Sequence, residues 1–136
     1  MDFTEAMLEK VAMEIHGTTE LIVGDHTISF KAPFKRVTIF FFFFEHTGID
    51  ISQMDEVELR SVCKKLHIET EASMWKGKLI DEIFGETSEG KYIQPTFITD
   101  YPVEMSPLTK KHRSKEGLVE RFELMINGKE VANAYT

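Results

Sequence analysis

An Asn-Gly dipeptide between two strand-like runs is the feature that most restricts how this chain can fold. Val119–Ile126 precedes Asn127-Gly128, and Lys129–Tyr135 follows it. Asn-Gly in this setting favours a two-residue type I′ turn, because the twist of that turn matches the twist of two antiparallel strands. Such a turn also fixes the residues that lie opposite one another: Ile126 and Lys129, Met125 and Glu130, Leu124 and Val131, and Glu123 and Ala132.

The predicted hairpin places two carboxylates on one face. Side chains alternate between faces, so Glu123 and Glu130 become diagonal neighbours about 7 Å apart. Two charges so close, with no cation beside them in the strand, carry a cost that a metal-chelated phosphate would remove. Mg²⁺ prefers one or two carboxylates together with substrate phosphates, and this separation suits it. The hairpin alone is explained as simply by two glutamates that face solvent, where glutamate is usually found.

The residues beyond Glu130 decide whether the hairpin carries a single site. Strict alternation puts Asn133 and Tyr135 on the face opposite Glu130. All four polar residues line one site only if a β-bulge lies between Glu130 and Asn133, and bulges concentrate beside active sites. Continuous pairing through Ala132 and Asn133 would exclude a single site. The predicted core-facing side chains of the hairpin are Phe122, Leu124, Ile126 and Val131.

The rest of the sequence contains both helical and strand-like segments. Apolar residues at helical spacing predict helices from about Phe3 to His16, Asp55 to Leu66 and Trp75 to Phe84. Gly17 and Gly85 are expected to end the first and third of these helices, and Asp55 to cap the second. The predicted strands are Leu21–Val23, Thr27–Phe30 and Thr96–Tyr101.

Five consecutive phenylalanines, Phe40–Phe44, have no amphipathic period. Such a run cannot leave one face in water without a cost, so the simplest prediction is a wholly buried strand or helix turn. Other interpretations are an engineered or misassigned stretch, or an interface with a partner structure that this chain lacks. The run would favour aggregation if it were exposed.

The composition restricts the function classes. A length of 136 residues fits one domain, and a formal net charge of −7 argues against tight nucleic-acid binding by this chain alone. The single cysteine, Cys63, excludes an internal disulfide and a multi-cysteine zinc site, and it fits a reducing cytoplasm. No apolar run approaches the roughly 18 residues of a membrane span, so no membrane partner is expected.

A basic cluster lies just before the hairpin in this acidic chain. Its members are Lys110, Lys111, His112, Arg113 and Lys115. A solvated loop is the simpler interpretation of this cluster. The alternative is a loop that handles a phosphate group or an RNA end.

The second half of the sequence contains the stretches YIQPTFITDYPVEMSPLTK and RFELMINGKEVANAY. Upstream, the chain reads HGTTE, KAPFKRVT, EHTGIDI and KGKLIDEIFGE in that order. Together these stretches resemble the middle of the catalytic domain of class II lysyl-tRNA synthetase, and the resemblance covers essentially the whole chain. The related aspartyl and asparaginyl enzymes also have a proline followed by a hairpin, but the sequence YIQPTFITDYPVEMSPL is typical of the lysyl enzyme.

This resemblance implies an α+β fold, with an antiparallel sheet flanked by helices, in one partial catalytic domain over residues 1–136. It implies an enzyme that activates lysine with ATP to lysyl-adenylate and then transfers the lysyl group to tRNA(Lys). By position, Glu123 and Glu130 match glutamates that hold Mg²⁺ on ATP. Glu130, Asn133 and Tyr135 match residues around the bound lysine, and an aromatic ring at Tyr135 suits an ammonium group. A cytoplasmic homodimer is implied as well, and no residue is assigned as a catalytic acid, base or nucleophile.

The chain departs from the family pattern in several places. The signature motifs that carry the ATP-binding arginines, the dimer motif and the anticodon-binding domain are absent, so we expect a fragment that is inactive alone. Phe41–Phe44 stands where the family has an amphipathic helix. Two alternatives stay open: a synthetase paralogue that lysylates a protein, and a non-enzymatic module that uses the phenylalanine run as an interaction surface.

Overall fold

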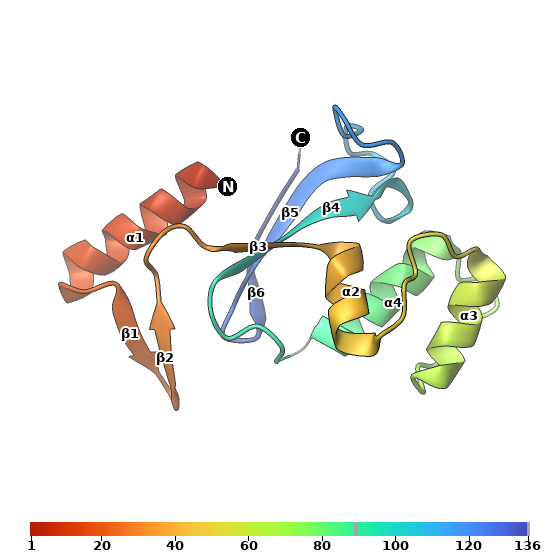
Figure 1. The fold of residues 1–136 in the computed structure, drawn as a ribbon, viewed down its shortest axis with the longest axis horizontal. Coiled ribbons are helices and arrows are strands. Elements are labelled where there is room, and N and C mark those ends of the chain that lie inside the picture. Colours follow the sequence, from red (N-terminus) through yellow and green to blue (C-terminus); the bar gives the residue numbers. More distant parts are fainter. Residues whose placement is uncertain (89, 136) are drawn as a thin grey trace.

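The computed structural model describes residues 1–88 and 90–135 and contains both helices and strands (Figure 1). The helices are α1 (Asp2–His16), α2 (Ile39–Thr47), α3 (Glu56–Lys65), α4 (Lys76–Ser88) and the 3₁₀ helix η1 (Val103–Met105). The strands are β1 (Glu20–Val23), β2 (His26–Ser29), β3 (Lys35–Thr38), β4 (Thr96–Pro102), β5 (Leu118–Ile126) and β6 (Lys129–Tyr135). The predicted α+β class is confirmed.

Four strands form the main sheet in the order β3-β4-β5-β6. The pairs β4–β5 and β5–β6 are antiparallel, as the resemblance predicts, whereas β3 lies parallel to β4. A parallel pair needs a long crossover connection, and α2, α3 and α4 supply it between β3 and β4. The short strands β1 and β2 form a separate antiparallel hairpin at the predicted place.

Apolar side chains pack on both faces of the main sheet. The larger core joins one face to α2 and α4, and it includes Ile98, Tyr101 and Val119 of the sheet. The smaller core lies on the other face around Phe97 and Leu124. Figure 1 shows the matching arrangement, with α1 and the β1–β2 hairpin at one end of the molecule and α2, α4 and α3 at the other.

A buried carboxylate joins α1 to the start of β3. Glu5 is 6% exposed, and its oxygens accept hydrogen bonds from the backbone N–H of Phe34 at 2.8 Å and from the guanidinium of Arg36 at 3.0 Å. Burial would raise the pKa of Glu5, but the Phe34 N–H and Arg36 lower that pKa more, so it lies below its ordinary value. The charged form of Glu5 therefore holds α1 against the sheet.

Most predicted helix boundaries are confirmed. Gly17 ends α1 with a φ of 70°, and the Asp55 side chain caps α3 by accepting a hydrogen bond from the Glu58 N–H at 2.9 Å. The predicted stop at Gly85 is wrong, because α4 continues to Ser88. A glycine inside a helix costs only about 1 kcal/mol relative to alanine, and the buried Ile83 and Phe84 offset that cost by packing.

The phenylalanine run forms most of α2, so the prediction of a helix turn is confirmed and the prediction of complete burial is wrong. Phe42 and Phe43 are 0% exposed, whereas Phe41 and Phe44 are 55% and 54% exposed. A helix has 3.6 residues per turn, so consecutive residues point around its whole circumference and some of them must face away from the core. No helix among the described residues, α2 included, is long and apolar enough to cross a membrane.

We predict that Phe42→Ala and Phe41→Ala have very different effects on stability. The Phe42 ring packs against Phe84, Tyr92 and His46 with centroid distances of 5.4, 5.5 and 4.5 Å. Its removal should lower the free energy of unfolding by about 3–5 kcal/mol, as for other buried phenylalanines. Phe41→Ala is the matched control and should change it by less than about 1 kcal/mol. Urea denaturation followed by circular dichroism measures both values, and equal losses would contradict this helix orientation.

Candidate functional site

The Asn127-Gly128 turn joins β5 to β6 as predicted. Both residues have positive φ, 53° for Asn127 and 74° for Gly128, as a type I′ turn requires. The turn is held against the preceding loop, because the N–H groups of Asn127 and Gly128 donate to the carbonyls of Ile93 and Tyr92, each at 2.8 Å. A Cβ at position 128 would lie 2.8 Å from the Cα of Gly90, so the close approach needs glycine.

The pairing of β5 with β6 contains the bulge that a single site requires. Ile126 pairs with Lys129 and Met125 with Glu130, but Leu124 then pairs with Ala132. Val131 is therefore the extra residue of a β-bulge. The predicted pairs of Leu124 with Val131 and of Glu123 with Ala132 are wrong. Val131 is also 55% exposed rather than core-facing.

The bulge reverses the faces of the residues that follow it. Asn133 pairs with Glu123, so both side chains lie on the face that also carries Glu130. Tyr135 pairs with Arg121 through its backbone, but its side chain lies outside the part that the structure describes. Its contact with lysine stays a prediction.

Glu123 and Glu130 differ in exposure. Glu123 is 5% exposed, so the interpretation of two solvated glutamates is wrong for this residue, whereas Glu130 is exposed. Burial raises the pKa of Glu123 above its ordinary value, and the negative charge of Glu130 raises it further. The structure thus places a buried carboxylate where a further positive charge would stabilise its ionised form.

A cavity of about 320 Å³ separates the hairpin from α4, and both glutamates line it. Such a volume lies at the lower end of the range for small-molecule sites. Among the residues that the structure describes, the lining of this cavity includes no lysine or arginine. The lining residues are Asp81, Phe84, Gly85, Ser88, Glu123, Met125, Gly128 and Glu130.

The donor set fits a magnesium ion that is held jointly with phosphates. Carboxylate oxygens are ligands that Mg²⁺ prefers, and it usually takes only one or two of them from the protein. Within residues 1–88 and 90–135, no group of three or more His, Cys, Asp and Glu side chains is placed to hold a metal ion. The hydroxyl of Tyr101 is also buried near Glu123 without a hydrogen-bond partner among the described residues. A hydrated ion between Glu123 and Glu130 would place a positive charge beside both carboxylates.

Comparison with known proteins identifies the family. The whole chain, residues 1–136, matches the sequence model of the class II tRNA synthetases of the D, K and N group. The chain belongs to this family. It is 65% identical to a lysine–tRNA ligase of Porphyromonas gingivalis over 100% of its own length and 24% of that protein. It is 57% identical to the lysine–tRNA ligases of Azobacteroides pseudotrichonymphae and Christiangramia forsetii, again over its full length, and covers 27% and 24% of them.

The comparisons confirm the family and show how much of its longer members this chain covers. The predicted resemblance to the lysyl enzyme is confirmed, and the chain spans about a quarter of the length of the curated relatives it matches, 24% for the first of them. All three relatives carry the same name, so neither the protein-lysylating paralogue nor the interaction module gains support.

Sequence reasoning missed one charged residue beside the two glutamates. Arg121 lies two residues before Glu123 on the same strand face, and its Nη2 donates to Glu123 Oε1 at 2.7 Å. The expectation that no cation lies beside the glutamates in the strand is therefore wrong. The period of two along a strand is the signal that would have found Arg121.

The basic cluster is largely paired with acidic side chains. Lys115 Nζ lies 2.5 Å from Asp100 Oδ2, His112 Nε2 lies 3.4 Å from Asp100 Oδ1, and Arg113 Nε lies 3.0 Å from Glu120 Oε1. These pairs tie the loop to β4 and β5. They favour the interpretation of a solvated structural loop over that of a phosphate or RNA contact.

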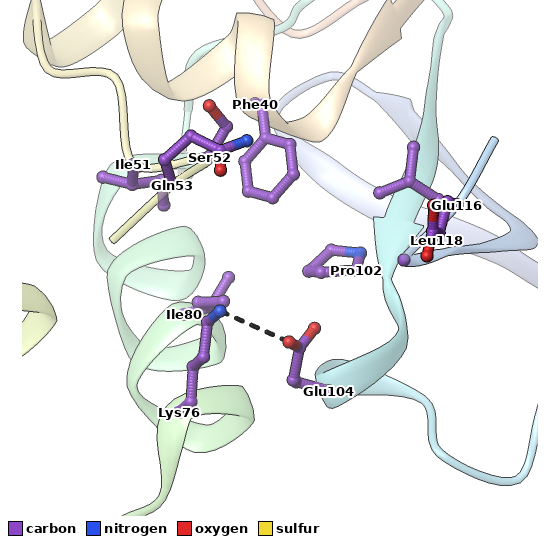
Figure 2. Close-up of a pocket in the computed structure, with 11 residues that line it drawn as sticks. Phe40, Ile51, Ser52, Gln53, Lys76, Ile80, Pro102, Glu104, Glu116 and Leu118 are labelled. Atoms are coloured by element: carbon purple, nitrogen blue, oxygen red, sulfur yellow. Dashed lines mark ion pairs between the residues drawn. The ribbon is translucent and has the colours of Figure 1, made fainter. Parts of the chain in front are cut away.

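A second cavity of about 350 Å³ lies away from the two glutamates, between α2, α4 and the segment that follows β4. Figure 2 shows Lys76 and Glu104 facing each other across it, with Phe40 and Pro102 nearby. Lys76 Nζ lies 3.3 Å from Glu104 Oε1, so the lysine charge there is already compensated. This cavity therefore has no free lysine charge at position 76 to attract an anionic substrate.

We predict that Glu123→Gln changes the pH dependence of stability. A carboxyl whose folded-state pKa is raised keeps its proton longer in the folded state, so its ionisation costs stability as pH rises above about 4.5. The unmodified chain therefore loses stability from the ionisation of Glu123 as the pH rises towards 8, and Glu123→Gln does not.

Urea denaturation at several pH values between 4.5 and 8 measures this effect as the difference in free energy of unfolding between variant and unmodified chain. That difference should shift in favour of Glu123→Gln as pH rises, whatever constant offset the substitution adds. The exposed Glu69→Gln is the matched control. A difference that is flat across this range would show that burial does not disfavour the ionised form of Glu123.

Proposed function

We propose that this chain forms part of the catalytic domain of a lysine–tRNA ligase, in which it binds lysine and Mg²⁺–ATP for the formation of lysyl-adenylate. The observation that carries the proposal is the bulge at Val131. It brings Asn133 onto the face of Glu123 and Glu130, beside a cavity that both glutamates line. The names of the relatives, each a lysine–tRNA ligase, support the choice of lysine and of tRNA.

Glu123 and Glu130 are the residues that would hold Mg²⁺ on the triphosphate of ATP. Bound there, Mg²⁺ would neutralise part of the phosphate charge. The sheet fixes the spacing of the two carboxylates, because they stand on paired strands on either side of the turn. Catalysis of phosphoryl and adenylyl transfer depends mainly on such positioning and on charge neutralisation.

By the resemblance, the amino acid would lie near Glu130, Asn133 and Tyr135. The carboxylate of Glu130 suits the positive charge of a lysine, and the aromatic ring of Tyr135 suits an ammonium group. These assignments rest on the family resemblance and on the shared face of Glu130 and Asn133.

The α-phosphate of ATP needs cations close to it, and the described residues that line this cavity include no lysine or arginine. We infer that such groups come from other parts of the ligase, of which this chain matches 24% in the Porphyromonas gingivalis relative. The isolated chain should therefore be inactive. Transfer to tRNA(Lys), assembly as a homodimer and a cytoplasmic location stay predictions that the resemblance implies.

A chimera tests the proposed function. In it, this chain replaces the matching segment of the Porphyromonas gingivalis lysine–tRNA ligase, which is 65% identical. We expect lysine-dependent ATP–pyrophosphate exchange by the chimera and none by the isolated chain. Glu123→Gln in the chimera should lower exchange about 100-fold or more, the scale of losing one preorganised electrostatic group. Glu69→Gln is the control for the substitution itself.

Two outcomes would argue against the proposal. Exchange by a folded chimera that carries Glu123→Gln at the unmodified rate would remove Glu123 from the site. A chimera that folds but exchanges with an amino acid other than lysine would refute the assignment of the substrate.

A further inference from the structure

We propose that Arg121 is a positioning residue that orients Glu123 and Asn133 together, so that binding of Mg²⁺–ATP and binding of lysine depend on one guanidinium group. The inference rests on the proposed function of this site. It assigns Arg121 no direct contact with either substrate. Its action goes through the two side chains that it holds.

All three nitrogens of the Arg121 guanidinium donate hydrogen bonds to different elements. Nη2 donates to Glu123 Oε1 at 2.7 Å, Nε donates to Asn133 Oδ1 at 3.1 Å, and Nη1 donates to Ser106 Oγ at 2.8 Å. These acceptors lie on β5, on β6 and directly after η1. One side chain therefore fixes the relative positions of two strands and the loop that follows β4.

The guanidinium is held in place by packing as well as by hydrogen bonds. Its central carbon lies 4.4 Å from the centroid of the Tyr101 ring, and the Arg121 side chain is only 16% exposed. Tyr101 itself is 0% exposed in the larger core. A planar cation that stacks on a buried ring has little freedom, and lysine cannot reproduce either the stacking or the fork of donors.

The hydrogen bond to Arg121 decides which end of the Asn133 amide is available to a ligand. A guanidinium has donors only, so Asn133 must turn its oxygen towards Arg121. The Asn133 NH₂ group is then left to donate to an acceptor on a substrate. A misplaced Arg121 would free the amide to rotate, and the site would lose this fixed donor.

The test uses the full-length chimera and steady-state ATP–pyrophosphate exchange. Arg121→Lys should raise the KM for lysine about tenfold, the change expected when one hydrogen bond to a charged group is lost. It should also raise the Mg²⁺ concentration needed for half-maximal rate, with a smaller change in kcat. Arg60→Lys is the matched control. Arg60 lies on the remote helix α3, and its guanidinium also donates several hydrogen bonds, to the carbonyls of Glu71, Ala72 and Met74.

A second background separates positioning from general stability. If Arg121 acts on lysine binding through Asn133, Arg121→Lys should change the KM for lysine by less than about twofold once Asn133→Ala is present. Equal fold-changes with and without Asn133→Ala would overturn the inference. An equal rise in KM with Arg60→Lys would overturn it too, since the effect would then follow from the loss of any arginine that makes several hydrogen bonds.

A milder variant covers the case in which Arg121→Lys does not fold. Ser106→Ala removes one acceptor of the guanidinium and leaves the charge and the other two bonds in place. It should raise the KM for lysine about threefold, a fraction of the loss expected for a whole hydrogen bond, and an unchanged KM would overturn the inference. An active unmodified chimera with an unaffected Arg121→Lys variant refutes this inference alone, whereas an inactive unmodified chimera refutes the proposed function and this inference together.

Discussion

One unpaired residue, Val131, sets the geometry on which the site depends. Side chains on a strand alternate strictly, so a single extra residue moves everything beyond it to the other face. With the bulge, Asn133 lies opposite Glu123 and the polar groups converge on the cavity beside α4. Without it, Asn133 would lie on the opposite face, beside the small core around Leu124 and Phe97 and away from Glu123 and Glu130.

The sheet combines two tasks that conflict. Its α4 side must be apolar enough to hold Ile98, Tyr101 and Val119 in the larger core, yet it also carries the carboxylate of Glu123. The conflict is reduced locally by Arg121, which pairs with Glu123 at the rim of that core. The remaining excess of negative charge from Glu123 and Glu130 is what a ligand cation would compensate.

The sequence predicted local features better than long-range ones. The Asn127-Gly128 turn and the first two pairs of the hairpin followed from turn chemistry alone, and the bulge followed only as a condition for a shared site. The parallel pairing of β3 with β4 had no local signal, because the two strands are separated by three helices. The exposure of Phe41 and Phe44 depends on where α2 sits against α4, and five identical residues carry no information about that orientation.

The mixed sheet also has a consequence for the order of folding. β5 and β6 are joined by a two-residue turn, so their pairing closes a very short loop, whereas β3 meets β4 only after the whole of α2, α3 and α4. Contacts between distant segments form slowly, because the entropy of a long loop is lost before the contacts form. We therefore expect the hairpin with the two glutamates to pair first, and the parallel edge strand β3 to join the sheet last.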